Sequence, residues 1–234
     1  MENTKSNFII LNNKLIAYTG PSVSEIKVPE GVEEINNGAF AYLDFCKSII
    51  MPSTLLRVEF SNRIKETFFL ENLDLSKCDK LEKCDISQQD KLKTLKLPLH
   101  LTDLNIIIFC HNADLDFLEL PATLKKIRID SDKSYYPHIK KIKFDTLNND
   151  IIHSGIFAQC DTIESTQTPI LNDNKCIIIN NIIVKVLDYT DLDKTFAKCS
   201  CIANGAMYPF YHSQKLTYKL NQSSHQIQEK VHCF

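Results

Sequence analysis

The sequence lacks the segments and motifs that identify membrane proteins and the common nucleotide-dependent enzymes. No stretch approaches the roughly 18 consecutive apolar residues that a membrane-spanning helix needs. The apolar run from Phe8 to Leu11, which follows a polar start, is too short for the core of a signal peptide. Glycine is scarce, with five residues, and there is no phosphate-binding loop, dinucleotide fingerprint or serine-centred nucleophile elbow.

An excess of charge of one sign is also missing. The 27 Lys and Arg residues nearly balance the 29 Asp and Glu residues, which leaves a formal net charge of −2. Nothing in the overall charge therefore attracts nucleic acid or an anionic lipid surface. The hydrophobic content of 44% and the charged content of 24% are typical of a folded chain rather than a disordered one. A chain of 234 residues could form one or two compact domains or one elongated domain.

A short strand-like motif recurs along the chain at a nearly constant step. Each copy begins with Ile or Leu, continues with any residue and a second hydrophobic or small residue, and in several copies ends with proline. A fixed step of 21 to 24 residues indicates a repeat architecture, and stacked repeats usually form binding surfaces rather than catalytic pockets. The copies begin at Ile26, Ile49, Leu73, Leu95, Leu118, Ile142 and Ile163.

Each unit predicts a strand, a turn and a second buried segment. The alternation within the motif is typical of a strand with one buried face. Proline ends such a strand because it has no amide proton, and Ser76 and Asp145 replace it as turn formers in two copies. We expect a polar substitution at Leu97, Leu120 or Ile127 to cost a few kcal/mol. Hydrophobic pairs spaced three apart follow the turns, as in Val32 and Ile35, Leu55 and Val58, Leu81 and Cys84, Leu101 and Leu104, and Leu124 and Ile127.

A second motif lies between some of the strands and leads to a family resemblance. Its Gly38 predicts a positive φ or a close backbone approach, and the motif recurs around Gly155 and Gly205. The whole segment Ile26-Lys-Val-Pro-Glu-Gly-Val-Glu-Glu-Ile-Asn-Asn-Gly-Ala-Phe40 resembles the BspA-type leucine-rich repeat family. The resemblance covers residues 8–168 best. It implies a leucine-rich repeat solenoid of the α/β class, rich in parallel strands and poor in helix, with about 23 residues per coil.

Two apolar segments interrupted by Asn-Asn, residues 8–18 and 176–186, predict β-hairpins. The first would shield one end of the solenoid, and the second marks a joint after which coils resume. We therefore divide the chain into residues 1–168, a hairpin cap with a repeat block, and residues 169–234, the second hairpin with C-terminal repeats of the same solenoid. The last unit starts at Leu216 and ends abruptly, which indicates either a truncated chain or an open C-terminal edge that allows end-to-end self-association.

The residues do not form a recognisable catalytic or metal site. The nine cysteines are an odd number and mostly occupy apolar repeat positions, which favours buried thiols in a reducing compartment. The closest approaches to metal-ligand spacing, Cys78 with Cys84 and Cys199 with Cys201, match no paired arrangement. A nucleophile and base drawn from Cys110-His111 and His153 would lack an orienting third group. We expect no catalytic residue, no metal and no cofactor.

The middle residues of the strands form the first candidate binding surface. Stacking in register would align them in one column, in which opposite charges on adjacent strands stabilise by roughly 0.2–1 kcal/mol per pair. The simpler interpretation is a sheet surface whose charges neutralise one another. The more specific interpretation is an adhesive stripe that binds a partner with charges of both signs. The cancelling charges argue against a nucleic-acid groove. The column contains Lys27, Ile50, Asp74, Lys96, Glu119, Lys143 and Glu164.

A basic cluster is the second candidate. Asp130 and Asp132 interrupt it, and Tyr135 and Tyr136 lie within it, so it could bind a polyanion or nucleic acid if it formed one patch. The alternative is that its members are the solvated positions of an ordinary repeat. The cluster consists of Lys125, Lys126, Arg128, Lys133, Lys140, Lys141 and Lys143.

These observations predict a non-enzymatic scaffold that presents an extended surface to a protein or glycan partner of unknown identity. The family resemblance implies cell-surface adhesion or host interaction, whereas the thiol pattern and the missing signal peptide favour the cytoplasm. We expect no nucleic-acid partner and no membrane span, with polyanion binding through the basic cluster as the alternative.

Overall fold

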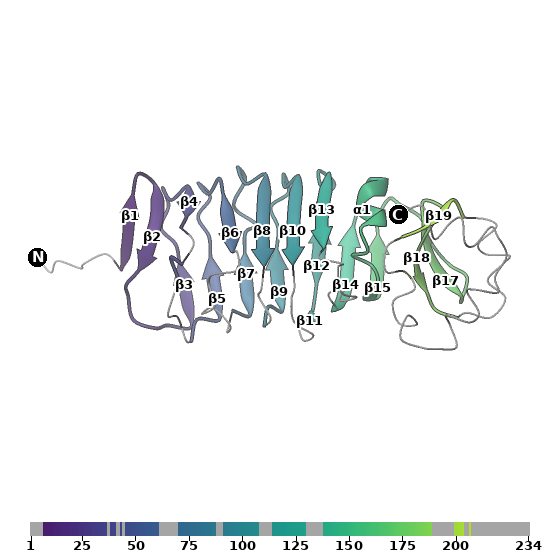
Figure 1. Cartoon of the computed structure of the whole chain (residues 1–234), viewed down its shortest axis with the longest axis horizontal. Helices are drawn as coiled ribbons and strands as arrows, with labels where there is room; N and C mark the ends of the chain where they lie inside the picture. The colour runs from purple at the N-terminus through teal and green to yellow at the C-terminus, as the bar shows by residue number, and fades with distance from the viewer. Residues whose placement is uncertain are drawn as a thin grey trace, which may run out of the picture.

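The computed structural model describes residues 7–36, 38–40, 43, 45–60, 70–87, 91–107, 114–129, 138–188, 199–203 and 206. Its coils follow one another along a single long axis to form a solenoid of about 7 turns with almost no helix (Figure 1). The strand-rich leucine-rich repeat solenoid expected for this chain is therefore confirmed. Among the described residues, no helix is long and apolar enough to cross a membrane.

The recurring motif forms the first of two parallel sheets, which occupies the lower row in Figure 1. Strand β14 is long enough to pair with both β11 and β12, and β15 pairs with its other edge. An isolated bridge between Thr94 and Phe117 joins β9 to the coil of β12. The strands are β3 (Glu25–Lys27), β5 (Ser48–Ile50), β7 (Asn72–Asp74), β9 (Thr94–Lys96), β11 (Asp114–Leu115), β12 (Leu118–Leu120), β14 (His138–Phe144) and β15 (Gln159–Ser165).

The hydrophobic pairs after the turns form the second sheet, in the upper row of Figure 1. Proline both ends the first strand and accepts the bond that closes the turn, since the carbonyl oxygens of Pro52 and Pro121 accept the N–H groups of Leu55 and Leu124. A bridge between Glu34 and Arg57 joins β4 to the coil of β6. The strands are β4 (Glu34–Ile35), β6 (Val58–Phe60), β8 (Lys83–Ser87), β10 (Asp103–Ile107) and β13 (Lys126–Ile129).

The described residues include one short helix, α1 (Asn149–His153), which takes the place of a second-sheet strand in the coil of β14. Asn148 caps its first turn by accepting the N–H of Ile151 on its side-chain oxygen, which is the usual role of Asn at this position. The amide group of the same side chain donates to the carbonyl oxygen of Leu124 over 3.1 Å. One side chain thus starts the helix and ties it to the coil of β13.

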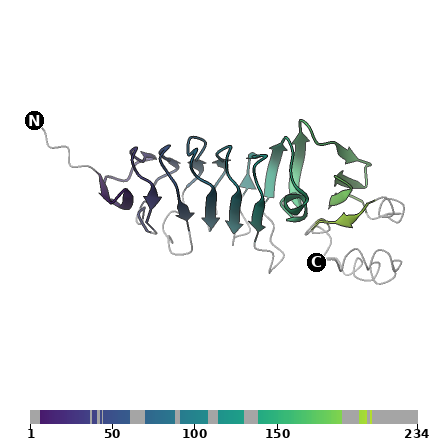
Figure 2. The same cartoon turned by 90° about the horizontal axis from the view of Figure 1, so that it is seen from above.

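Both Asn-Asn segments form the hairpins that the sequence predicts. The first joins β1 (Phe8–Leu11) to β2 (Lys14–Tyr18), and the second joins β17 (Cys176–Ile179) to β18 (Ile182–Val186). All four turn asparagines have positive φ, between 49° and 62°, as a two-residue turn of this hand requires. The second hairpin gains a strand on each side, β16 (Ile170–Asn172) and β19 (Cys201–Ile202). Figure 2 shows it beyond the end of the stacked coils.

A continuous apolar core runs along the solenoid and includes the side chains that the repeat predicts. Leu120 is buried, Ile127 is 9% exposed, and Leu97 is only partly buried against the core. Gly38 and Gly155 have positive φ as expected, whereas Gly205 lies outside the described residues. The residues that follow these two glycines, including Phe40 and Phe157, are buried.

Candidate functional site

The middle residues of the first-sheet strands lie in register and on the outer face. Strand pairing aligns Lys27 with Ile50, Ile50 with Asp74, and Asp74 with Lys96. Farther along, Glu119 pairs with Lys143 and Lys143 with Glu164. The residue before each member from Lys27 to Lys143, such as Ile26 or Leu73, is buried, so these side chains point away from the core. We call this set the mid-strand column.

Ion pairs connect neighbours within the mid-strand column. The Nζ atom of Lys96 lies 3.0 Å from Oδ2 of Asp74, and that of Lys143 lies 2.9 Å from Oε1 of Glu119. Burial tends to raise the pKa of Asp74, but hydrogen bonds from Ser76 and Lys96 outweigh burial, and the pKa is lowered. The column therefore stabilises its own charges, at the modest energy that exposed pairs contribute.

A second charged column, which the sequence analysis missed, runs beside the first. Here Lys47 and Lys93 lie 3.0 Å and 2.9 Å from the two carboxylate oxygens of Glu71. Lys140 contacts Asp116 at 2.5 Å. The hydrogen bonds from Lys93 and Lys47 lower the pKa of Glu71. We call the set the flanking column; in order along the solenoid it contains Lys47, Glu71, Lys93, Asp116, Lys140 and Asp161.

The flanking column was detectable in the sequence. Its members precede the first hydrophobic residue of each motif copy by two positions, and the members of the mid-strand column follow that residue by one. The residues at this second fixed position of the repeat alternate in charge along the sequence. The outer face of the first sheet thus has two parallel rows of alternating charge rather than one.

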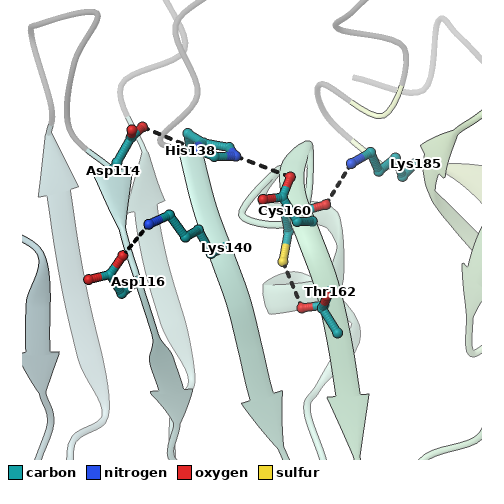
Figure 3. Close-up of polar contacts among 8 residues, drawn as sticks. Asp114, Asp116, His138, Lys140, Cys160, Thr162 and Lys185 are labelled. Carbon is teal, nitrogen blue, oxygen red and sulfur yellow. Dashed lines mark hydrogen bonds and ion pairs between the residues drawn. The ribbon is translucent and has the colours of Figure 1, made fainter.

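His138 lies between two aspartates at the end of these columns. Figure 3 shows its contact with Asp114. Its Nδ1 atom lies 3.0 Å from Asp114, one coil back, and its Nε2 atom lies 3.1 Å from Asp161, one coil on. Burial alone would lower the pKa of His138, but the hydrogen bonds and charges of Asp161 and Asp114 outweigh burial and raise the pKa. Among the described residues of this face, His138 is the group whose charge changes near neutral pH and so alters the charge pattern.

The basic cluster is divided between the two sheets. Lys126 and Arg128 lie on β13 of the second sheet, with Lys125 just before it, whereas Lys140 and Lys141 lie on β14 of the first. Lys140 contacts Asp116, and Lys141 contacts Glu164 at 2.8 Å. The structure therefore does not bring these residues into one patch. Lys133 lies outside the described residues.

The β13 part of the cluster instead borders a hollow of about 220 Å³ on the second sheet. Asn105 lies at its base and donates from Nδ2 to Oδ2 of Asp85 over 2.9 Å. The Oδ1 atom of Asn105 is buried and, within the part of the chain that the structure describes, accepts no hydrogen bond. Four cations and two carboxylates make the lining net positive. The charged residues are Arg57, Lys83, Asp85, Asp103, Lys126 and Arg128.

The described cysteines are free thiols, and all but Cys201 are buried. Burial raises the pKa of Cys78 to about 12 and that of Cys160 to about 11. Cys201 lies 3.3 Å from Nε2 of His153, a pairing that the sequence did not indicate. Cys110 and His111, which were considered with His153 as a possible nucleophile and base, lie outside the described residues. No group of three or more metal-ligating side chains occurs in the described parts of the chain.

Comparison with known proteins agrees with this geometry. A family model described as a BspA type leucine rich repeat region matches residues 11–131 and 88–217, with six copies of the repeat. No curated protein and no solved structure matches the chain.

Proposed function

Because the chain belongs to the BspA type leucine-rich repeat family, we propose that it is a non-enzymatic scaffold that presents the outer face of its first sheet to a protein partner. Repeat solenoids of this kind offer extended surfaces, and the fold is typically non-enzymatic. The partner is a protein surface with charges of both signs, spaced to match the two columns.

The continuous register of the two charged columns is the observation behind this proposal. Along the mid-strand column from Asp74 to Glu164, neighbouring strands about 4.8 Å apart carry charges of opposite sign, so a partner meets a regular pattern rather than a field of one sign. Such a pattern contributes to specificity and register more than to affinity, because each charge already has a neighbour on the sheet.

Site-specific photo-cross-linking tests the docking face. A photoreactive residue at Lys93 should form an adduct of defined mass, whereas the same residue at Leu99, exposed in a turn, should not. Unlabelled wild-type protein should suppress the adduct. The double variant Asp74→Lys/Lys96→Glu should not, because it keeps an ion pair but inverts its polarity. Equal adducts at both positions, or equal competition by the double variant, would contradict this assignment.

A location at the cell surface, with a role in adhesion or host contact, is the finer form of the proposal. It rests on the family resemblance, and the buried free thiols neither require nor oppose it. Labelling of intact cells with a membrane-impermeant reagent tests it directly. Strong labelling supports a surface role, and a signal confined to the cytosol removes it.

Anion binding in the second-sheet hollow is a second candidate function. The net positive lining and the unpaired acceptor Asn105 Oδ1 favour a ligand that combines an anion with a hydrogen-bond donor. Wild-type protein should then bind a heparin column at low salt and elute as salt rises. Lys126→Glu/Arg128→Glu should abolish retention, whereas Lys140→Glu/Lys141→Glu on the other sheet should not. Absence of retention at low salt would exclude this function.

We also propose that the chain is organised in two blocks, residues 1–168 and 169–234. The second hairpin has a small apolar cluster of its own, which includes Cys176, Ile183 and Ile202, and supports the division. Lys185 links the blocks by donating to the carbonyl oxygen of Cys160 over 2.5 Å (Figure 3). Limited proteolysis that first cuts between the blocks would support the division. The C-terminal unit from Leu216, where end-to-end association was expected, lies outside the described residues.

A further inference from the structure

The two hairpins of the solenoid have the same turn, the same strand register and a register shift at the same position. Each turns through two asparagines with positive φ, and each has a register shift between the second and third residues of its first strand. Phe8 thereby corresponds to Cys176, and Leu11 to Ile179. Strand β1 is thus the counterpart of β17, and β2 that of β18.

The equivalence extends to the coil that follows each hairpin. Strand β2 pairs in parallel with β4, and β18 pairs in parallel with β19. The N–H of Asn36 donates to the carbonyl oxygen of Leu15 at 2.8 Å, as the N–H of Ala203 donates to that of Ile183 at 2.8 Å. Two further backbone hydrogen bonds match. The N–H of Tyr18 donates to the carbonyl oxygen of Ala39 at 2.7 Å, as that of Val186 donates to Ala206 at 2.8 Å. The N–H of Ala39 donates to the carbonyl oxygen of Asn36 at 2.9 Å, as that of Ala206 donates to Ala203 at 3.1 Å.

One strand distinguishes the two modules. Strand β16 pairs antiparallel with the outer edge of β17, where it contacts Ile177, Ile178 and Ile179 in register. Strand β1 instead stands at the end of its sheet, and no described segment pairs with its outer edge.

The apolar side chains of β17 are also more buried than their counterparts on β1. Ile178 is 6% exposed and Ile179 is fully buried, whereas their counterparts Ile10 and Leu11 are 37% and 60% exposed. Ile9, the counterpart of Ile177, is 45% exposed. The edge strand of the module is therefore paired in the second hairpin, as β17, and exposed in the first, as β1.

Strand β1 is an apolar edge strand, which is unusual because an edge of this kind can pair with another chain. Natural sheets protect such edges with charged residues, proline or a covering segment. Between Phe8 and Leu11, strand β1 has no charged residue and no proline, and none of the described strands pairs with its outer edge. Its chemistry is that of a strand which accepts another strand.

We propose that β1 pairs antiparallel with β1 of a second copy of this chain across a twofold axis. The pairing at the equivalent edge is antiparallel, and a twofold axis perpendicular to the strands sets a strand antiparallel to its copy. The residues that β16 places against Ile178 and Ile179 are Leu171 and Ile170, and β1 offers its partner the same aliphatic class in Ile9, Ile10 and Leu11. The N-terminal ends of two solenoids then join into one longer sheet.

The association is weak, since only a four-residue strand from each copy takes part. Interfaces below about 1,000 Å² are characteristic of transient complexes, so the dimer forms as protein concentration rises. This self-association goes beyond the proposed scaffold role and does not depend on the charged columns.

Sedimentation velocity over about a hundredfold range of protein concentration tests the proposal. We expect the wild-type mass to rise from one to two chains, and Leu11→Lys to remain a monomer throughout. Leu99→Lys, which adds the same charge at a side chain 72% exposed in a turn, should dimerise like the wild type. Ile9→Lys serves as a second edge variant, and circular dichroism verifies that each variant is folded.

A synthetic peptide with the sequence of residues 168–173, which contain β16, provides the matched competitor. It should dissociate the wild-type dimer because it presents the strand that covers the equivalent edge. A wild-type chain that stays monomeric overturns the proposal, and peptide binding by that monomer would assign the edge to a foreign strand. Dimerisation of Leu11→Lys and Ile9→Lys at the wild-type concentration overturns it as well.

Discussion

The Nδ1 atom of His138 lies 3.0 Å from Oδ1 of Asp114, a residue 24 positions earlier and one coil away. The contact joins two strands that the sequence separates by a full repeat. Asp161 provides the second contact from the next coil, so the imidazole bridges three successive coils. The solenoid therefore contains a titratable group that is coupled to its stacking.

The first prediction concerns the pH dependence of this bridge. Both aspartates favour the imidazolium, so the pKa of His138 in the folded protein exceeds its unfolded value of about 6.5. A raised pKa stabilises the fold fully below about pH 6.5, and the contribution is lost as pH rises through the folded pKa. Compared with His138→Gln, the wild type should melt at a higher temperature near pH 5.5, with a smaller difference near pH 8.

An NMR titration of the His138 ring provides the direct measurement. Asp161→Asn and Asp114→Asn should each lower the pKa, and the two together should lower it further. A wild-type pKa below the unfolded value of about 6.5, or no change in either variant, would contradict the bridge.

The second prediction concerns thiol reactivity. Burial raises the pKa of Cys78 and that of Cys176 to about 12, so neither forms a thiolate near neutral pH. Half-buried Cys201 should therefore react with iodoacetamide well before these two in the native protein. Peptide mapping by mass spectrometry resolves the order, and labelling in denaturant provides the control in which all three react. Equal native rates would be inconsistent with the buried positions.

The third prediction compares a buried and a partly buried side chain at the same position of two repeats. Leu120→Asn should lower the free energy of unfolding by about 3–5 kcal/mol, because it removes a buried side chain and buries an amide. Leu97→Asn, at a partly buried side chain, should lower it by only about 1–2 kcal/mol. Urea denaturation measures both, and Leu99→Asn in an exposed turn should have almost no effect. A Leu97 variant as unstable as the Leu120 variant would argue against the packing described above.

The fourth prediction concerns the first hairpin turn. Asn13 is exposed and has a φ of 61°, so Asn13→Ala should lower the free energy of unfolding by about 1 kcal/mol through backbone strain alone. Asn13→Gly should not destabilise the protein, since Asn-Gly is the favoured sequence for this turn. Thermal melts of the two variants give the comparison. An alanine variant as stable as the glycine variant would mean that the turn has another conformation in solution.

Most of the fold could be predicted because its determinants are periodic. Ile26, Ile49 and Leu73 lie in strands that pair in the expected register, since each unit can bury its apolar face only against the next. The hairpins followed from Asn-Asn between apolar runs. Helix α1 and strand β16 could not be predicted, because each occurs once and their sequences depart from the repeat.

The candidate site was predicted only in part. The mid-strand column was predicted from one fixed position in each repeat. The flanking column occupies a second fixed position, which was not considered. The basic cluster illustrates the opposite error. Lys126 and Lys140 are near each other in the sequence, but the turn between successive segments of a coil places them on different sheets.

Helix α1 also has a consequence for how proteins of this design change length over evolution. A duplication of one whole unit upstream of β13 adds a strand to both sheets and leaves every register intact. After β13 the same duplication would place a new second-sheet strand against the helix that Asn148 anchors to Leu124. Gain and loss of repeats should therefore be concentrated between residues 26 and 121, while the segment from 145 to 186 keeps a constant length.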